Sequence, residues 1–285
     1  MKILRLQPLL DNGARYNYSV NYGVWDWIDS NKLPLHYLRN QSDAYIESFD
    51  IVFMPMFKRW QGEMDQAERL KSLNVMTVLF DNDSCYRSFT HKFYDGIDFI
   101  FYRCEDQDGY LPKVPSAHLL WSVDTGYFTP FYGGHGVSFN CTVDHYSYVL
   151  RQAISKHIKP TNYTGSEYLE HLQYSAAGIH TNSDICRVPR AKLLEFAACG
   201  TQIISNRMDG IDNYFPDHLI DYFDSIEELL KMVKSFEPDA SKQKELRRIT
   251  ERHHSHKKRA DEVMDILSGT FDLNKKGNSV NFVSQ

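Results

Sequence analysis

The sequence predicts an α/β protein with two Rossmann-like domains that face a cleft. Short apolar runs rich in β-branched and aromatic residues alternate with longer amphipathic stretches, which is typical of βαβ units around a parallel sheet. This alternation restarts after a segment punctuated by Pro and Gly. The length of 285 residues also exceeds that of a usual single domain, which is about 100 to 200 residues. Two domains of similar size are therefore expected.

The first domain is expected over residues 1–130. Its apolar runs predict strands at Lys2–Leu6, Ile51–Met54, Val75–Phe80, Ile97–Tyr102 and Ala117–Leu120, with amphipathic helices at Tyr16–Asp29 and Gln61–Leu73. The segment Phe128–Gly134, Phe-Thr-Pro-Phe-Tyr-Gly-Gly, suits a linker because Pro and Gly interrupt regular structure.

The second domain is expected over residues 131–270, and residues 271–285 are expected to form a mobile tail with few apolar side chains. Predicted strands lie at Val137–Cys141, Ala176–His180, Thr201–Ser205 and Leu219–Phe223. Predicted helices lie at Tyr146–Lys156, Tyr168–Tyr174, Pro189–Ala198, Ile226–Lys234 and Ser241–Leu267.

Composition excludes several classes of protein. With 32 basic and 37 acidic side chains, the net charge of −5 gives no overall attraction to a polyanion such as nucleic acid. A local basic patch that binds one is still possible. The start lacks the pattern of a signal peptide, and no run approaches the roughly 20 apolar residues that span a bilayer. We therefore expect a cytoplasmic protein without a membrane span. The five cysteines show no zinc-ligand spacing and are expected to be reduced thiols.

The most informative stretch runs from Arg187 to Asn206. Within it, Pro189 suits the first turn of a helix and Gly200 suits the left-handed position that ends one. A buried strand, Thr201–Ser205, follows directly. The sequence thus predicts a helix, a tight turn and a strand in that order.

Charged residues on this helix suggest a ligand. Arg187 and Arg190 lie near its N-terminus, where backbone N–H groups already favour anions, so a diphosphate would suit this end. Lys192 and Glu195 are three residues apart and share one face. A carboxylate one turn along can accept hydrogen bonds from both hydroxyls of a ribose. The plain alternative is a solvated Lys/Glu pair on a surface helix.

Pro189, Lys192, Leu193-Leu194-Glu195, Ala198 and Gly200-Thr201 resemble the donor-site motif of GT-B glycosyltransferases, in particular family-four enzymes and the spore-maturation-like group. The resemblance implies a metal-independent transfer from a nucleotide sugar such as a UDP-sugar. It assigns the donor ribose to Glu195 and the departing diphosphate to Lys192 or Arg190. The second glutamate, seven residues before the motif glutamate, is absent, because that position is Val188.

Three further segments extend the resemblance over most of the chain. Leu120–Pro130 resembles the connector that ends the first domain, and Arg252–Met264 resembles the closing helix. Val137–Thr142, followed by Arg151, resembles the first strand and loop of the nucleotide domain. The expected donor-binding residues are therefore Thr142, Arg151, Arg187, Arg190, Lys192 and Glu195.

The first domain is expected to bind the acceptor. Gly13 and Arg15 stand where these enzymes carry a glycine-rich acceptor loop, although a plain turn would look the same. Asp83 or His91 would act as general base there, and Lys192 completes the expected catalytic set. Asp81-Asn-Asp83 also has the Asp-x-Asp form that holds Mn²⁺ or Mg²⁺ against a diphosphate in GT-A enzymes, so a metal site is an alternative.

The acceptor class stays open between a glycan, a small molecule and a modified base of DNA. Some bacteriophage enzymes of this fold transfer sugar to modified bases of DNA, and the basic stretch Arg247–Arg259 could contact nucleic-acid phosphates or simply be a charged helix face. The same reading favours a solvated face over a metal site for His253, His254 and His256. A catalytically silent nucleotide-sugar or protein-binding module is the third alternative.

Overall fold

The structure is a computed structural model that describes residues 1–7, 23–55, 69–81, 97–102, 115–144, 148–182 and 188–270. The chain divides into two compact units. One comprises Met1–Ala14, Trp25–Leu120 and Ala260–Gln285, and the other comprises Arg15–Val24 and Trp121–Arg259. Both units contain a parallel sheet, so the predicted α/β class is confirmed.

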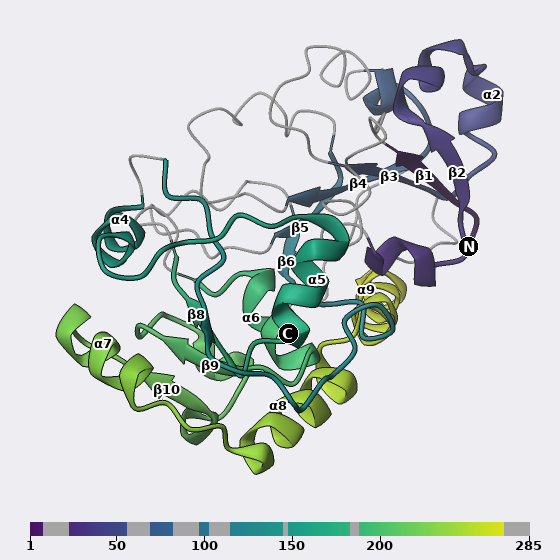
Figure 1. Cartoon of the computed structure of the whole chain (residues 1–285). Coiled ribbons are helices and arrows are strands. Elements are labelled where there is room, and N and C mark those ends of the chain that lie inside the picture. The colour runs from purple at the N-terminus through teal and green to yellow at the C-terminus, as the bar shows by residue number, and fades with distance from the viewer. Residues whose placement is uncertain are drawn as a thin grey trace. The chain divides into compact units, whose positions relative to one another are not determined.

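The first unit is built on a parallel sheet with strand order β2-β1-β3-β4-β5-β6 (Figure 1). Its strands are β1 (Ile3–Gln7), β2 (Asn31–Pro34), β3 (Ile51–Pro55), β4 (Met76–Asp81), β5 (Phe99–Tyr102) and β6 (Ser116–His118). Short helical elements follow β1 and β2: η1 (Gly23–Trp27), η2 (Leu35–Asn40) and α2 (Asp43–Ile46). Buried Leu4, Val52, Leu79 and Ile100 carry the core from strand to strand. Strand β2 was not expected, because its Asn-Lys-Leu-Pro sequence lacks an apolar run and suits only a sheet edge.

The second unit is built on a parallel sheet with strand order β10-β9-β8-β7. Its strands are β7 (Val137–Ser138), β8 (Ala177–His180), β9 (Gln202–Ser205) and β10 (Ile220–Tyr222). Its helices are α4 (Val149–Ser155), α5 (Gly165–Gln173), α6 (Ala191–Ala198), α7 (Ile226–Lys234) and α8 (Ala240–His253), and α9 (His256–Thr270) begins in it. Short turns η4 (Ile211–Asn213) and η5 (Asp217–Leu219) precede β10. Strands β8 and β9 are buried at every residue, as expected of inner strands covered on both faces.

Helix α6 begins later than Pro189 predicts. Arg190 has the extended backbone of an N-cap residue (φ −111°, ψ 165°), so Pro189 precedes the helix and does not occupy its first turn. The other end is confirmed, because Gly200 has φ +72°, a left-handed conformation that suits glycine. Its hydrogen bond from N to the carbonyl of Ala197, at 3.1 Å, closes the helix end.

The helix expected over Ser241–Leu267 is interrupted. Ser255 forms a parallel bridge with Val123, and the backbone N–H of His256 donates to the Val123 carbonyl at 3.0 Å. A backbone that pairs in this way cannot continue the helix, so α8 ends and α9 starts again. His254 and His256 are buried, which corrects the expectation of a solvated face for the three histidines; only His253 is exposed. His254 Nε2 lies 3.0 Å from the Tyr214 carbonyl oxygen, and His256 Nδ1 lies 2.9 Å from Ser122 Oγ.

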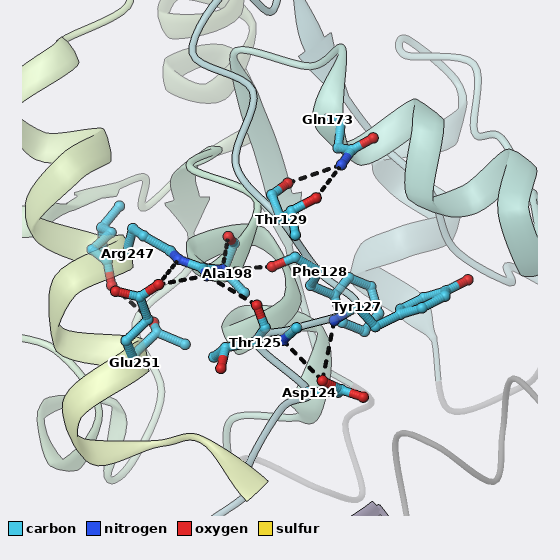
Figure 2. Close-up of polar contacts among 12 residues, drawn as sticks. Asp124, Thr125, Tyr127, Phe128, Thr129, Gln173, Ala198, Arg247 and Glu251 are labelled. Atoms are coloured by element: carbon cyan, nitrogen blue, oxygen red, sulfur yellow. Dashed lines mark hydrogen bonds and ion pairs between the residues drawn. The ribbon is translucent and has the colours of Figure 1, made fainter.

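Arg247 of α8 fastens the segment that opens the second unit (Figure 2). Its guanidinium donates to the carbonyl oxygens of Phe128 and Ala198, both at 2.5 Å, and of Thr125 at 2.9 Å. Gln173 of α5 donates to the carbonyl oxygen of Thr129, in the same segment, at 3.0 Å. Residues 124–129 lie within the predicted connector Leu120–Pro130 and are called the connector below. These contacts hold them to α5, α6 and α8. Within the described residues, no helix is long and apolar enough to cross a membrane.

Candidate functional site

Polar residues gather where the strands of the second unit end. The register places His180, the last residue of β8, beside Ser205, the last of β9, so these two strands finish together. Asn140 follows β7, Thr181 and Asn182 follow β8, and Asn206 follows β9. Because carboxyl ends of parallel strands share one edge, these residues line the edge at which α/β proteins bind ligands.

Three buried polar atoms at this edge lack a hydrogen-bond partner in the part of the chain that the structure describes. The Nε2 atom of His180 and the Oδ1 atoms of Asn182 and Asn206 have no hydrogen-bond partner among the described residues. His180 and Asn182 are 1% and 7% exposed. Buried polar atoms are usually paired, so unpaired ones at a strand edge indicate a place where a polar ligand can supply the missing bonds.

Helices α5 and α6 bring a tyrosine and a carboxylate together. The Tyr168 hydroxyl donates to Glu195 Oε2 at 2.5 Å, and both side chains are at most 3% exposed. Burial raises the pKa of Glu195, while the Tyr168 bond and the Lys192 ammonium act in the opposite direction. The Glu195 carboxylate is therefore almost fully enclosed, and its role in donor binding stays a prediction.

Lys192 links α6 to the end of β7. Its Nζ donates to the Asn140 carbonyl oxygen and lies 5.5 Å from the centre of the Tyr168 ring, a cation–π contact. Burial lowers the pKa of this ammonium. Lys192 and Glu195 both contact Tyr168, which confirms that they share a face of the helix. Because an ammonium carries three N–H donors, the bond to Asn140 leaves capacity for an anionic ligand.

Arg151 of α4 reaches the end of β8. Its Nε donates to Thr181 Oγ1 at 3.0 Å and its Nη2 to the Thr181 carbonyl at 2.6 Å. A longer contact of 3.5 Å joins its Nη1 to the carbonyl oxygen of Thr142, and its guanidinium stacks on Tyr148 at 4.2 Å. The guanidinium is thus oriented by the strand end that is followed by Asn182, whose Oδ1 has no partner among the described residues.

The charges of three cations act on His180. Burial, together with the charges of Arg151, Lys192 and Arg190, lowers the pKa of His180 to about 3. The imidazole is therefore neutral at neutral pH. The cations come from α4, from the first turn of α6 and from its N-cap residue. Their charges together make the electrostatic potential at the end of β8 positive, which suits a phosphate group.

A separate hollow of about 410 Å³ lies beside β9 and β10, and it suits an anion poorly. Its lining includes three aspartates against one arginine, and that arginine is 3.7 Å from Asp217. The lining residues are Arg207, Met208, Asp209, Ile211, Asp212, Asp217 and Tyr222. Electrostatics therefore favour the end of β8 over this hollow for a diphosphate.

The described residues cover only part of the predicted site. They bring Arg151, Arg190, Lys192 and Glu195 together with the backbone of Thr142. Gly13, Arg15, Asp83, His91 and Arg187 lie outside the described residues, and their roles stay predictions. The Asp-x-Asp alternative is likewise untested, since only the backbone of Asp81 is described. Within the described ranges, no three His, Cys, Asp or Glu side chains are grouped as metal ligands.

Sequence reasoning missed Tyr168, His180 and Asn182. The pair Thr181-Asn182 directly follows a predicted strand and could have been found by that signal. Tyr168 gave no such signal, because its partner Glu195 lies 27 residues further along the chain.

Comparisons with known proteins complete this picture. Residues 135–265 match the family model described as glycosyl transferase-like. The structure resembles that of Anabaena Alr3699/HepE, solved in complex with UDP-glucose, with a TM-score of 0.63 and 10% identity over 94% of this chain and all of that one. The chain has the GT-B fold, and residues 135–265 form a glycosyl transferase-like domain within it.

Two further solved structures share the fold of this glycosyltransferase. A DNA-modifying β-glucosyltransferase gives a TM-score of 0.63 at 9% identity, covering 93% of this chain and 99% of that one. AviGT4, a glycosyltransferase of avilamycin A biosynthesis, gives 0.55 at 14% identity, covering 93% and 96%. A search of curated protein sequences finds no match to the glycosyltransferase. At these identities the solved structures show the fold alone.

Proposed function

We propose that this glycosyltransferase takes its sugar from a UDP-sugar whose diphosphate binds at the end of β8. The observation that carries the proposal is that Arg151 bonds Thr181 after β8 and Lys192 bonds Asn140 after β7, while the charge of Arg190 acts with theirs on His180. The complex of HepE with UDP-glucose supports the choice of donor class. Glu195 would accept hydrogen bonds from the ribose hydroxyls, and the unpaired oxygen of Asn182 would accept one from the donor.

In the proposed reaction, an acceptor hydroxyl oxygen attacks the anomeric carbon of the donor sugar. The bond from that carbon to the β-phosphate oxygen breaks, and UDP leaves with the bonding electrons. Negative charge grows on the leaving diphosphate, so fixed cations stabilise the transition state more than the ground state. Lys192 and Arg190 would supply this charge, and we propose that no metal is required. Asp83 or His91 would take the proton from the acceptor.

The test is calorimetric titration of UDP and UDP-glucose into the full chain, with and without Mn²⁺. Arg190→Ala and Lys192→Met should each weaken UDP binding about 10- to 100-fold, the range expected for a lost charged hydrogen bond. Arg248→Ala is the matched control, because Arg248 is an exposed cation that pairs with Glu245 at 2.5 Å, on α8. Binding that needs Mn²⁺, or equal losses in all three variants, would contradict the proposal.

A modified base of DNA is the second candidate acceptor. Lys244, Arg248 and Arg252 are spaced four residues apart along α8 and are exposed, so they form one stripe on that helix. The solved β-glucosyltransferase described as a DNA-modifying enzyme shares the fold. Binding to duplex DNA that weakens steeply with salt, and that Lys244→Ala and Arg252→Ala reduce, would support this acceptor. Salt-insensitive or absent binding would leave a glycan or small molecule.

A further inference from the structure

Tyr168 lies between the two charged residues of the donor motif. It is 1% exposed, its hydroxyl donates to Glu195 Oε2 at 2.5 Å, and its ring lies 5.5 Å from Lys192 Nζ. One side chain on α5 therefore contacts both motif residues on α6. The donor motif itself gives no indication of this third member.

The hydroxyl restricts what the carboxylate can do. A carboxylate accepts through two oxygens, and Tyr168 occupies one lone pair of Oε2. The bond limits rotation of the carboxylate about its last torsion, which is otherwise broad. Oε1 and the second lone pair of Oε2 stay available for the two hydroxyls of a ribose. Without Tyr168, the carboxylate could rotate toward Lys192 instead.

Other contacts hold the tyrosine in place. The Phe128 ring packs edge-on against the Tyr168 ring, with centroids 6.5 Å apart. Phe128 belongs to the connector, which Arg247 holds through its carbonyl oxygen and Gln173 ties to α5 through Thr129 (Figure 2). Phe128 therefore fixes the position of the Tyr168 ring, and the hydroxyl is directed at Glu195 before a ligand binds.

We propose that Tyr168 is a positioning residue for donor binding, because its hydroxyl fixes the Glu195 carboxylate in the orientation that receives the donor ribose. The inference rests on the proposed function, since it assumes that Glu195 binds the ribose. Tyr168 contacts no part of the donor in this role and acts only through Glu195.

Tyr168→Phe tests the proposal, because it removes the hydroxyl and keeps the ring that contacts Phe128 and Lys192. We expect the KM for the UDP-sugar and the Kd for UDP to rise about tenfold, as for loss of a hydrogen bond to a charged group, with kcat changed less than about twofold. Tyr214→Phe is the matched control. It also removes a buried tyrosine hydroxyl, which accepts a 3.0 Å hydrogen bond from the backbone N–H of Trp121 in the same unit.

The double variant Tyr168→Phe/Glu195→Ala shows whether the tyrosine acts through the carboxylate. If it does, Tyr168→Phe/Glu195→Ala binds UDP no more weakly than Glu195→Ala alone, because alanine leaves the hydroxyl no side-chain acceptor to orient. Tyr168→Phe/Glu195→Gln shows whether an amide at this position is still oriented. Additive losses in the alanine double variant would overturn the proposal, as would equal losses in Tyr168→Phe and Tyr214→Phe. Wild-type binding that Glu195→Gln weakens and Tyr168→Phe leaves unchanged would overturn the role of Tyr168 alone. Wild-type protein that binds no UDP-sugar would overturn the proposed function itself.

Discussion

Arg247 donates a hydrogen bond to the carbonyl oxygen of Ala198, 49 positions earlier in the chain, at 2.5 Å. Ala198 is the last residue of α6, so a cation meets the end of the helix at which unpaired carbonyls and the helix dipole concentrate negative charge. The same guanidinium holds the connector at Phe128 and Thr125. One buried side chain thus joins α6, which carries Lys192 and Glu195, to the segment that packs against Tyr168.

Arg247→Ala should destabilise the second unit by about 3 kcal/mol or more, because it leaves buried carbonyl oxygens unpaired. Arg247→Lys should recover only part of this loss, since an ammonium cannot match the fork of a guanidinium. Differential scanning calorimetry measures both changes, with Arg248→Ala as the exposed control. A melting temperature unchanged in Arg247→Ala would show that the three carbonyls find other partners.

Donor affinity should depend on pH through Glu195. Burial raises the pKa of Glu195 above the ordinary glutamate value of about 4.3. In the proposed role the ionised carboxylate accepts the ribose hydroxyls, so we expect affinity for UDP-glucose to fall as pH is lowered through this raised pKa. Glu195→Gln should bind UDP-glucose more weakly at neutral pH, and its affinity should not show this fall at acid pH, which is called the acid limb below. UDP-glucose is the proper ligand, because both its phosphates stay ionised across the range.

Tyr168→Phe should move that acid limb to higher pH. The Tyr168 hydrogen bond favours the charged carboxylate and lowers its pKa, so removing the hydroxyl raises the pKa further. The charged and titratable groups that act on this carboxylate are Lys192 on α6 and Cys199 at its end. Calorimetric titrations of wild type and variant between pH 5 and 8 measure the midpoint. Coincident curves would mean that the hydroxyl does not influence the ionisation of Glu195.

Acid should weaken the fold through His254. Burial and the neighbouring Arg259 lower its pKa to about 4, although its bond to the Tyr214 carbonyl acts the other way. Because the folded pKa lies below the unfolded value of about 6.5, the stabilisation is complete above that pH and is lost as pH falls toward 4. The expected loss is on the order of 3 kcal/mol. Calorimetry of wild type and His254→Gln should show a flatter pH dependence for the variant, and parallel profiles would contradict this.

Gly200→Ala should cost about 1–3 kcal/mol of stability. An alanine at φ +72° is strained, and its Cβ would lie 2.7 Å from Cε1 of Tyr132. The double variant Gly200→Ala/Tyr132→Ala removes the steric clash and keeps the backbone strain. Its melting temperature should therefore lie between those of Tyr132→Ala alone and Gly200→Ala. A double variant as stable as Tyr132→Ala alone would show that the backbone strain is negligible.

Local patterns in the sequence predicted most strands and helices, although not β2 or the break between α8 and α9. They also predicted the helix–turn–strand unit that carries Lys192 and Glu195. Helical spacing places Lys192 and Glu195 on one face in any helix, and the left-handed turn at Gly200 needs only glycine and its neighbours. The α/β class follows for the same reason, because alternating apolar patterns are properties of short segments.

Only the tertiary structure decided what surrounds these residues. Glu195 is buried because Tyr168, 27 residues away, covers and bonds it, and α8 ends because Val123 pairs with Ser255. Pro189 stays outside α6, although its position suited a first turn. In the sequence, Arg247 is one of several charged residues in a basic helix. Its role follows only from its hydrogen bond to the carbonyl oxygen of Phe128, 119 positions earlier. Such contacts join segments distant in the chain, and their energies depend on burial and geometry that no local pattern records.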